Sequence, residues 1–267
     1  MFAGIDIGST STKVVVMDAK GNMAHHIVPS GSNFSIGYKK ALNKALNKLN
    51  GALKDIAGTI TTGYGRHIAK IESEPVTEIT CVAKGALFLD SGIRTIIDIG
   101  GQDTKAISID DNGNLANFVL NDKCAAGTGR FLEAIAASLG LTLDKLAKIS
   151  LKSSTILPIS NTCTVFAETE VISRLSKGES TDGIARGIHN SLASKIYSLA
   201  KRIKIREKIL VCGGGALNEG LIRELRDQFG TMGDAVIHPD NLDPRLVPAI
   251  GAALIAKENY IARSVPK

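Results

Sequence analysis

Residues 4–23, GIDIGSTSTKVVVMDAKGNM, and residues 96–115, IIDIGGQDTKAISIDDNGNL, are two versions of one pattern. When the first segment is laid over the second, the same residue types coincide at Asp6, Ile7, Gly8, Thr12, Lys13, Asp18, Gly21 and Asn22, which fall on Asp98, Ile99, Gly100, Thr104, Lys105, Asp110, Gly113 and Asn114. Each copy has the features of a β-branched strand ending in Asp, a glycine turn, a second strand, an Asp/Asn/Gly turn and a third strand. The chain is therefore expected to contain two copies of one supersecondary unit.

Helical patterns follow each set of strands. The spacing of apolar residues predicts helices at roughly 36–49, 76–89, 128–139, 164–177, 182–204 and 247–262. Two further strands, at 55–63 and 208–214, are each followed by glycine, and the second leads into the helical segment LNEGLIREL. Because strands alternate with helices in duplicated halves, we expect an α/β protein of two lobes around one cleft. Lobe I would comprise residues 1–93 with 246–267, and lobe II residues 94–245.

The composition is that of an ordinary globular protein. Of the 267 residues, 44% are hydrophobic, and the longest apolar run, LVPAIGAALIA, is too short to span a bilayer. The amino terminus, MFAGIDIG, lacks the pattern of a signal peptide, so we expect a cytoplasmic protein without membrane association. The net charge of +6 would suit an acidic partner, but aromatic residues make up only 4% and Trp is absent. We therefore expect no nucleic-acid partner.

The two glycine turns, DIGSTSTK and DIGGQDTK, are candidates for phosphate binding. A glycine turn lets backbone N–H groups approach phosphate oxygens, while hydroxyls and a lysine add donors and positive charge. The carboxylates of Asp6 and Asp98 would hold Mg²⁺ through water, since this ion dehydrates reluctantly. A pair of β-hairpins with glycine present only for turn geometry is the alternative, and the duplication favours the phosphate site. The residues assigned to the phosphates are Gly8, Ser9, Thr10, Ser11, Thr12, Lys13, Gly100, Gly101, Gln102 and Asp103.

A third glycine motif, VCGGGALNEG at 211–220, joins a buried strand to a helix. Gly213, Gly214 and Gly215 would let an adenine and ribose lie against the backbone, with Asn218 or Glu219 near the sugar. A plain strand-to-helix turn is the alternative. The chain has no GxxxxGK[ST] motif, which argues against a P-loop enzyme.

The four cysteines divide into two kinds. Cys81 lies in a helical pattern and Cys212 in a buried strand, as is usual for small core residues. Cys124 and Cys163 each follow a short polar segment, NDK or SNT, and each stands just before a predicted helix. Helix N-termini favour thiolates, and on the residues alone these two cysteines could line a phosphate site, act as nucleophiles, hold a metal or fill space. A nucleophilic role lacks a His nearby in sequence, with His189 left open as a spatial neighbour; His25, His26 and His238 have the pattern of surface or packing residues.

The three glycine motifs, in this order, resemble those of the actin, Hsp70 and sugar-kinase superfamily. The correspondence is phosphate-1 at 4–18, phosphate-2 at 95–109 and adenosine at 209–225, with connecting helices at 76–89 and 247–258. The resemblance implies two RNase H-like lobes that close around ATP. Gly127, Thr128 and Gly129, in the AAGTG after Cys124, are expected to meet the nucleotide phosphates at the start of the next helix.

NDKCAAGTGRFLE together with ISNTCTVFAETEVISRLSKGE resembles the activator ATPases of 2-hydroxyacyl-CoA dehydratases, of the BadF/BadG/BcrA/BcrD type. The resemblance implies a homodimer that shares one [4Fe-4S] cluster, with Cys124 and Cys163 as ligands. The chemistry agrees, because a cubane takes four thiolates and a two-fold axis turns two ligands into four. The segment DPRLVPAIGAAL departs from the corresponding run of the activators, which leaves the partner subtype open.

The function implied by this resemblance is an ATPase that acts as an ATP-dependent one-electron donor. Ferredoxin or flavodoxin would supply the electron, and a 2-hydroxyacyl-CoA dehydratase would receive it. Asp6, Asp98 and Gln102 form the predicted catalytic set, with Gln102 positioning the attacking water and Glu168 or Glu170 as alternatives. Benzoyl-CoA reductase or a double-cubane cluster protein is the alternative partner. A small-molecule kinase of the same fold and an actin-type filament protein are the rival functions.

Overall fold

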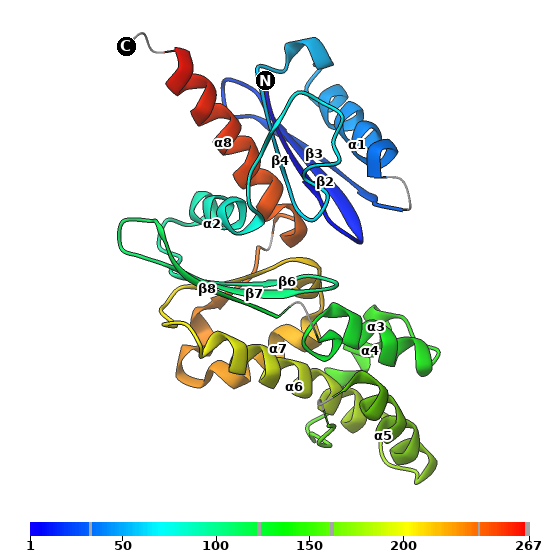
Figure 1. The fold of residues 1–267 in the computed structure, drawn as a ribbon. Helices are drawn as coiled ribbons and strands as arrows, with labels where there is room; N and C mark the ends of the chain where they lie inside the picture. Colours follow the sequence, from blue (N-terminus) through cyan, green and yellow to red (C-terminus); the bar gives the residue numbers. More distant parts are fainter. Residues whose placement is uncertain (32–33, 122–123, 161–162, 240, 265–267) are drawn as a thin grey trace. The chain divides into compact units, whose positions relative to one another are not determined.

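The computed structural model describes residues 1–31, 34–121, 124–160, 163–239 and 241–264. The chain forms two compact units. Unit 1 comprises Met1–Ser91 with Arg245–Lys267, and unit 2 comprises Gly92–Pro244. In the described residues each unit contains one mixed sheet of five strands, as Figure 1 shows for both. The predicted α/β class is confirmed.

The sheet of unit 1 has the strand order β3-β2-β1-β4-β5. β1 is antiparallel to β2, β2 is antiparallel to β3, and β4 runs parallel to β1. The central strand β1 is buried along its whole length, which requires cover on both of its faces. The strands are β1 (Phe2–Ile7), β2 (Ser11–Met17), β3 (Met23–Pro29), β4 (Gly58–Thr62) and β5 (Glu74–Pro75).

Helices α1 (Phe34–Lys48) and α8 (Val247–Ser264) cover the two faces of this sheet (Figure 1). Ile5 and Ile7 share a buried cluster with Tyr38 and Leu42 of α1. The alternate residue Gly4 lies instead against the backbone of α8. This two-residue alternation is that of a β-strand between two helical layers.

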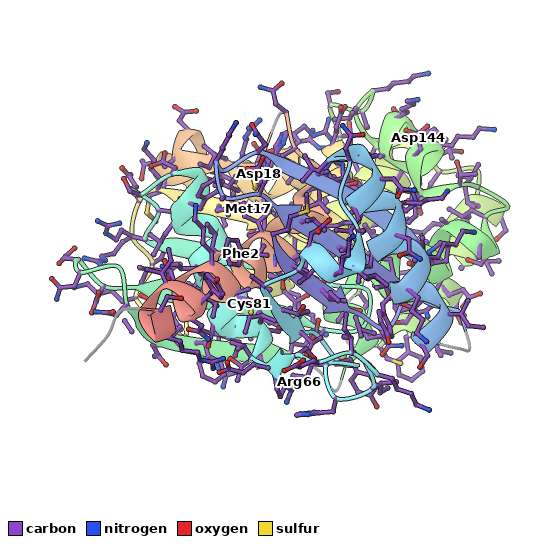
Figure 2. The ribbon with its side chains drawn as sticks, turned by 90° about the horizontal axis from the view of Figure 1, so that it is seen from above. Phe2, Met17, Asp18, Arg66, Cys81 and Asp144 are labelled. Carbon is purple, nitrogen blue, oxygen red and sulfur yellow. The ribbon has the colours of Figure 1, made fainter. Side chains whose placement is uncertain are left out.

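Glycines allow α8 to cross α2 (Glu78–Leu89) with the two backbones in contact. A Cβ on Gly85 would strike the Val247 carbonyl, and a Cβ on Gly251 would strike the Cys81 carbonyl. Beside this crossing Cys81 packs in a buried cluster with Phe2, both labelled in Figure 2. The helices therefore fit together only where side chains are missing.

The sheet of unit 2 repeats the arrangement, with the order β10-β9-β6-β7-β8. Asp6 pairs with Lys13 in unit 1, and Asp98 pairs with Lys105 in unit 2. The duplication also includes the parallel neighbour of each central strand, because Asp6 pairs with Thr62 as Asp98 pairs with Cys212. The strands are β6 (Thr95–Ile99), β7 (Thr104–Ile109), β8 (Leu115–Asn121), β9 (Ile209–Cys212) and β10 (Val236–Ile237).

The helices of unit 2 enclose its main core. Ile97 and Ile99 of the central strand pack with Phe131, Ile188 and Leu192 of the helices. A short helix that was not predicted, α4, is capped by the Thr142 hydroxyl, which accepts from Lys145 N. In the described residues no helix is long and apolar enough to cross a membrane. The helices are α3 (Gly129–Ser138), α4 (Leu143–Ser150), α5 (Thr164–Ser176), α6 (Thr181–Ala200) and α7 (Glu219–Phe229).

The helix crossing in unit 1 predicts opposite effects for two Gly→Ala substitutions. Gly251→Ala forces a methyl group into the backbone of α2, so we expect it to lower the free energy of unfolding by about 1–3 kcal/mol. Gly37→Ala is the matched control, because its Cβ would make only ordinary van der Waals contacts, with Val28, Pro29 and Ser30. Alanine should there gain roughly 0.5–1 kcal/mol through helix propensity. Urea unfolding measures both values, and equal stability of the two variants would contradict the close crossing.

Candidate functional site

A buried aspartate ends the central strand of unit 1. Asp6 is 1% exposed, and its Oδ2 lies 2.9 Å from Lys13 Nζ. Its Oδ1 is buried without a hydrogen-bond partner among the described atoms. Gly63 lies directly against this oxygen with a φ of +82°, where only a residue without Cβ fits. The turn after Asp6 is closed by a hydrogen bond from Gly8 N to Ser11 O of 3.2 Å.

Unit 2 carries the same construction at Asp98, which is 3% exposed. Lys105 Nζ lies 3.5 Å from Asp98 Oδ2 and 2.8 Å from Asp103 Oδ2, so one ammonium forms ion pairs with two carboxylates. Gly213, with a φ of +80°, lies against Asp98 Oδ1 as Gly63 does against Asp6. Gly63 is thus the unit 1 counterpart of Gly213, a correspondence that was not predicted from the sequence.

The residues of the two turns differ in accessibility. Thr10 and Gln102 are exposed, and Ser9, Ser11 and Gly101 are half-buried. Thr12, which the sequence analysis assigned to phosphate, is fully buried, and its hydroxyl shares a hydrogen bond of 3.0 Å with Ser30 Oγ. That hydroxyl therefore has a structural partner inside unit 1.

The segment after Cys124 is hydrogen-bonded to the unit 2 turn. Gly129 N donates to Gly100 O at 3.0 Å, and Arg130 N donates to Gly101 O at 3.1 Å. Behind the turn, Thr104 Oγ1 donates to Gly127 O at 2.8 Å. Hydrogen bonds therefore join the predicted phosphate turn directly to the segment that follows Cys124, within unit 2.

The two candidate cysteines differ in their local backbone. Cys163 is the N-cap of α5, as expected. Cys124 instead precedes a short 3-10 turn, Ala125–Gly127, and α3 begins only at Gly129 because Thr128 is extended, with φ −137° and ψ 174°. Thr128 is fully buried, and its hydroxyl donates to Ala125 O. Residues 122–123 and 161–162, part of the polar NDK and SNT segments, lie outside the described residues.

The other two cysteines are core residues, as predicted. Cys81 and Cys212 are both 0% exposed, whereas Cys124 and Cys163 are half-buried. Burial raises the pKa of the Cys81 thiol to about 12, although a hydrogen bond with Thr62 acts in the opposite direction. Cys81 is therefore a neutral thiol at physiological pH.

The adenosine motif has one open position and one capping residue. Nothing lies where a Cβ of Gly214 would be, while Gly215 lies against Ile99. Asn218 Oδ1, which the sequence analysis placed near a sugar, accepts from Leu221 N at 2.9 Å and caps α7. Its Nδ2 is buried without a partner among the described atoms.

The remaining candidates contribute to packing and local structure. His189 is fully buried on α6, its Nδ1 lies 2.7 Å from Ala185 O, and burial lowers its pKa. Glu170 accepts from Ser160 N at 2.9 Å and pairs with Arg174, so it holds the segment that leads to Cys163. Glu168 is half-buried on α5.

The donor groups fit the two inorganic cofactors implied by the sequence. The unpartnered Oδ1 of Asp6 can accept a hydrogen bond from a water on Mg²⁺. Cys124 and Cys163 are free, half-buried thiols, the ligand type that iron–sulfur clusters take. The described residues contain no group of three or more His, Cys, Asp or Glu side chains placed to hold a metal.

The duplicated sheets, each with a buried aspartate and a glycine turn, define an α/β protein of the actin, Hsp70 and sugar-kinase fold. A ROK-family glucokinase from Streptomyces griseus shares this fold, with a TM-score of 0.60 at 14% identity over 96% of this chain and 99% of that one. Residues 3–256 match the BadF/BadG/BcrA/BcrD ATPase family, and the chain belongs to that family.

Two members of the family are much more similar. The activator of lactoyl-CoA dehydratase from Anaerotignum propionicum is 45% identical over 256 residues, which cover 96% of each chain. The solved activator of 2-hydroxyisocaproyl-CoA dehydratase from Clostridium difficile, with bound ADPNP, has a TM-score of 0.90 and 39% identity. That match covers 100% of this chain and 99% of the other.

The burial of the cysteines predicts which thiols react in the folded chain. At pH 8 iodoacetamide should modify Cys124 and Cys163 and spare Cys81 and Cys212, because the latter are buried and the raised pKa of Cys81 keeps it protonated. Peptide mass spectrometry of cluster-free protein reads the four sites. All four should react after denaturation, which serves as the control. Rapid labelling of Cys81 in the folded protein would contradict the structure.

Proposed function

We propose that this protein is an ATP-dependent one-electron donor. Hydrolysis of ATP would drive electron transfer from a [4Fe-4S] cluster, bridging a homodimer, to a 2-hydroxyacyl-CoA dehydratase. The observation that carries the proposal is the bonding of the Cys124 segment to the Gly100–Gly101 turn. The family relatives, named as dehydratase activators, support the choice of partner.

The nucleotide would be held by the two duplicated turns and by the adenosine motif. Asp6 and Asp98 would orient the waters of Mg²⁺, while the lysine beside each carboxylate limits the repulsion between carboxylate and phosphate. The exposed Gln102 would position the attacking water. Gly214, where a Cβ would find open space, is the candidate for close approach by the adenosine.

The cysteines would hold the cluster across a two-fold axis. Each chain supplies Cys124 and Cys163, and a C2 dimer makes four thiolates from these two positions. When bound, the cluster supplies a one-electron redox centre. The chain's own contribution is to place the two thiols, one before the 3-10 turn that leads to α3 and the other at the N-terminus of α5.

The bonds between Gly129 and Gly100 and between Arg130 and Gly101 give the coupling a physical basis. A shift of the turn on binding phosphate would move the backbone that follows Cys124, because backbone hydrogen bonds tolerate little change in length. MgATP can drive such a shift only by binding two conformations with different affinity.

The electron source and the acyl substrate are the finer parts of the proposal. A reduced ferredoxin or flavodoxin would load the cluster. The two relatives act with dehydratases of lactoyl-CoA and of 2-hydroxyisocaproyl-CoA, so the substrate class would be a 2-hydroxyacyl-CoA. The paired cysteines have no role in a sugar kinase, whose likeness to this chain extends to the fold alone.

Replacing the unit 2 aspartate tests the nucleotide part of the proposal. Asp98→Asn should slow MgATP hydrolysis about a hundredfold, because the amide cannot orient Mg²⁺ as the carboxylate does. Steady-state phosphate release measures the rate, and iron content should be retained. Asp110→Asn, in the surface turn between β7 and β8, is the matched control and should hydrolyse ATP at the wild-type rate. Full activity of Asp98→Asn would refute the assignment.

Replacing each cysteine tests the cluster part. Iron should be found at about four atoms per dimer, because two cysteines per chain complete one Cys₄ site across the axis. Cys124→Ser and Cys163→Ser should each abolish the visible iron–sulfur absorption. Cys81→Ser and Cys212→Ser should retain it with lower stability, since each buries a hydroxyl in the core. Four irons per chain would point to a site within one chain.

A further inference from the structure

A lysine of α6 contacts the sulfur of Cys124. Lys195 Nζ lies 3.6 Å from Cys124 Sγ, within the range of an N–H···S hydrogen bond. The two residues are 71 positions apart, so the contact is made by the fold of unit 2. The stem of Lys195 lies beside Gly127, where a Cβ would stand 3.6 Å from Lys195 Cδ. The lysine is therefore held along the same segment that carries the cysteine.

The pocket beside this contact is lined, among the described residues, mainly by apolar and positively charged side chains. Lys195 on α6 and Arg202, which follows the end of this helix, line a pocket of about 260 Å³ beside β8. The other lining residues are Leu120, Asn121, Gly127, Ile196, Ser198 and Leu199. None of these residues is a carboxylate, and apolar neighbours strengthen the effect of a charge on its surroundings.

We infer that Lys195 is a positioning residue for the redox centre, acting through the sulfur of Cys124. Its ammonium donates to that sulfur and offsets the negative charge of the ligand. A cluster of four thiolates becomes more negative on reduction, and hydrogen bonds to its sulfurs and nearby positive charge raise its potential. Lys195 thus favours the reduced state. This inference rests on the proposed function, and the two-fold axis gives each cluster two such lysines.

The first test measures the midpoint potential of the cluster by redox titration with EPR detection. Lys195→Met should shift the potential to more negative values, and Lys195→Arg should keep it near that of the wild type, because the charge and an N–H donor remain. Lys201→Met removes an exposed lysine from the end of the same helix, where Lys201 lies over Tyr197, and serves as the control. Equal potentials for Lys195→Met and Lys201→Met would overturn the inference.

The second test uses cluster-free protein and is independent of the proposed function. In a Cys163→Ser background, the reaction rate of Cys124 is compared for an anionic aromatic disulfide and for an uncharged dipyridyl disulfide. The rate with the anionic reagent divided by the rate with the uncharged reagent reports the charge near the sulfur. Changes in the exposure of the thiol affect both rates and cancel in this ratio. Lys195→Met should lower the ratio about threefold or more, and Lys195→Arg should preserve it. An unchanged ratio in Lys195→Met would refute the contact.

The two results separate the possible failures. If the wild type takes up no cluster, the proposed function and the redox role of Lys195 both fail. The ratio of the two disulfide reaction rates still decides whether the lysine acts on Cys124. If the cluster forms and the ratio falls but the potential does not move, the lysine contacts the sulfur without tuning it, and the inference fails alone. A circular dichroism spectrum like that of the wild type would show that the fold of Lys195→Met is intact.

Discussion

Both units depend on a buried aspartate at the end of the central strand, paired with a lysine on the neighbouring strand. Burying a carboxylate is costly unless it is paired, and the lysines supply that pairing at Asp6 and Asp98. The carboxylate in turn restricts the adjacent chain, because a Cβ at Gly63 or Gly213 would strike its Oδ1. One acidic side chain thus accounts for the lysine beside it and for the glycine that follows the parallel strand.

Much of the fold could be predicted because the two copies of the repeat share identical residues at many positions. The antiparallel strands of each unit and most helices follow from apolar spacing and from the repeated DIG turn. The short helix α4 and the two-residue strands β5 and β10 carry too few residues for a periodic signal. The unit 1 counterpart of the GGG motif, TGYG at residues 62–65, was not recognised because it keeps only the first and third glycines. The spacing also differs, since in the described residues four α-helices lie between β8 and β9 and one lies between β3 and β4.

The candidate site could be predicted less completely, because several of its contacts join distant parts of the chain. The exposure of the four cysteines followed from their local patterns, whereas the contact between Cys124 and Lys195 had no signal in either segment. The buried bond between Thr12 and Ser30 likewise depends on the pairing of β2 with the end of β3. Asn218 at the start of α7 is different, since Asn is a common N-cap and this role could have been recognised from sequence.

Each unit has a hydrophobic core of its own, and this affects what loss of a bound metal would do to the protein. Apolar side chains fill the interior of each unit, and Cys124, which is half-buried, packs against the core of unit 2. Zinc-finger domains differ, because for them binding metal and folding are one event. In the proposed dimer the metal would link two chains that are already folded, so its loss would lead to dissociation rather than denaturation. Assembly would then follow the square of the chain concentration, and a damaged protein could be reloaded without being refolded.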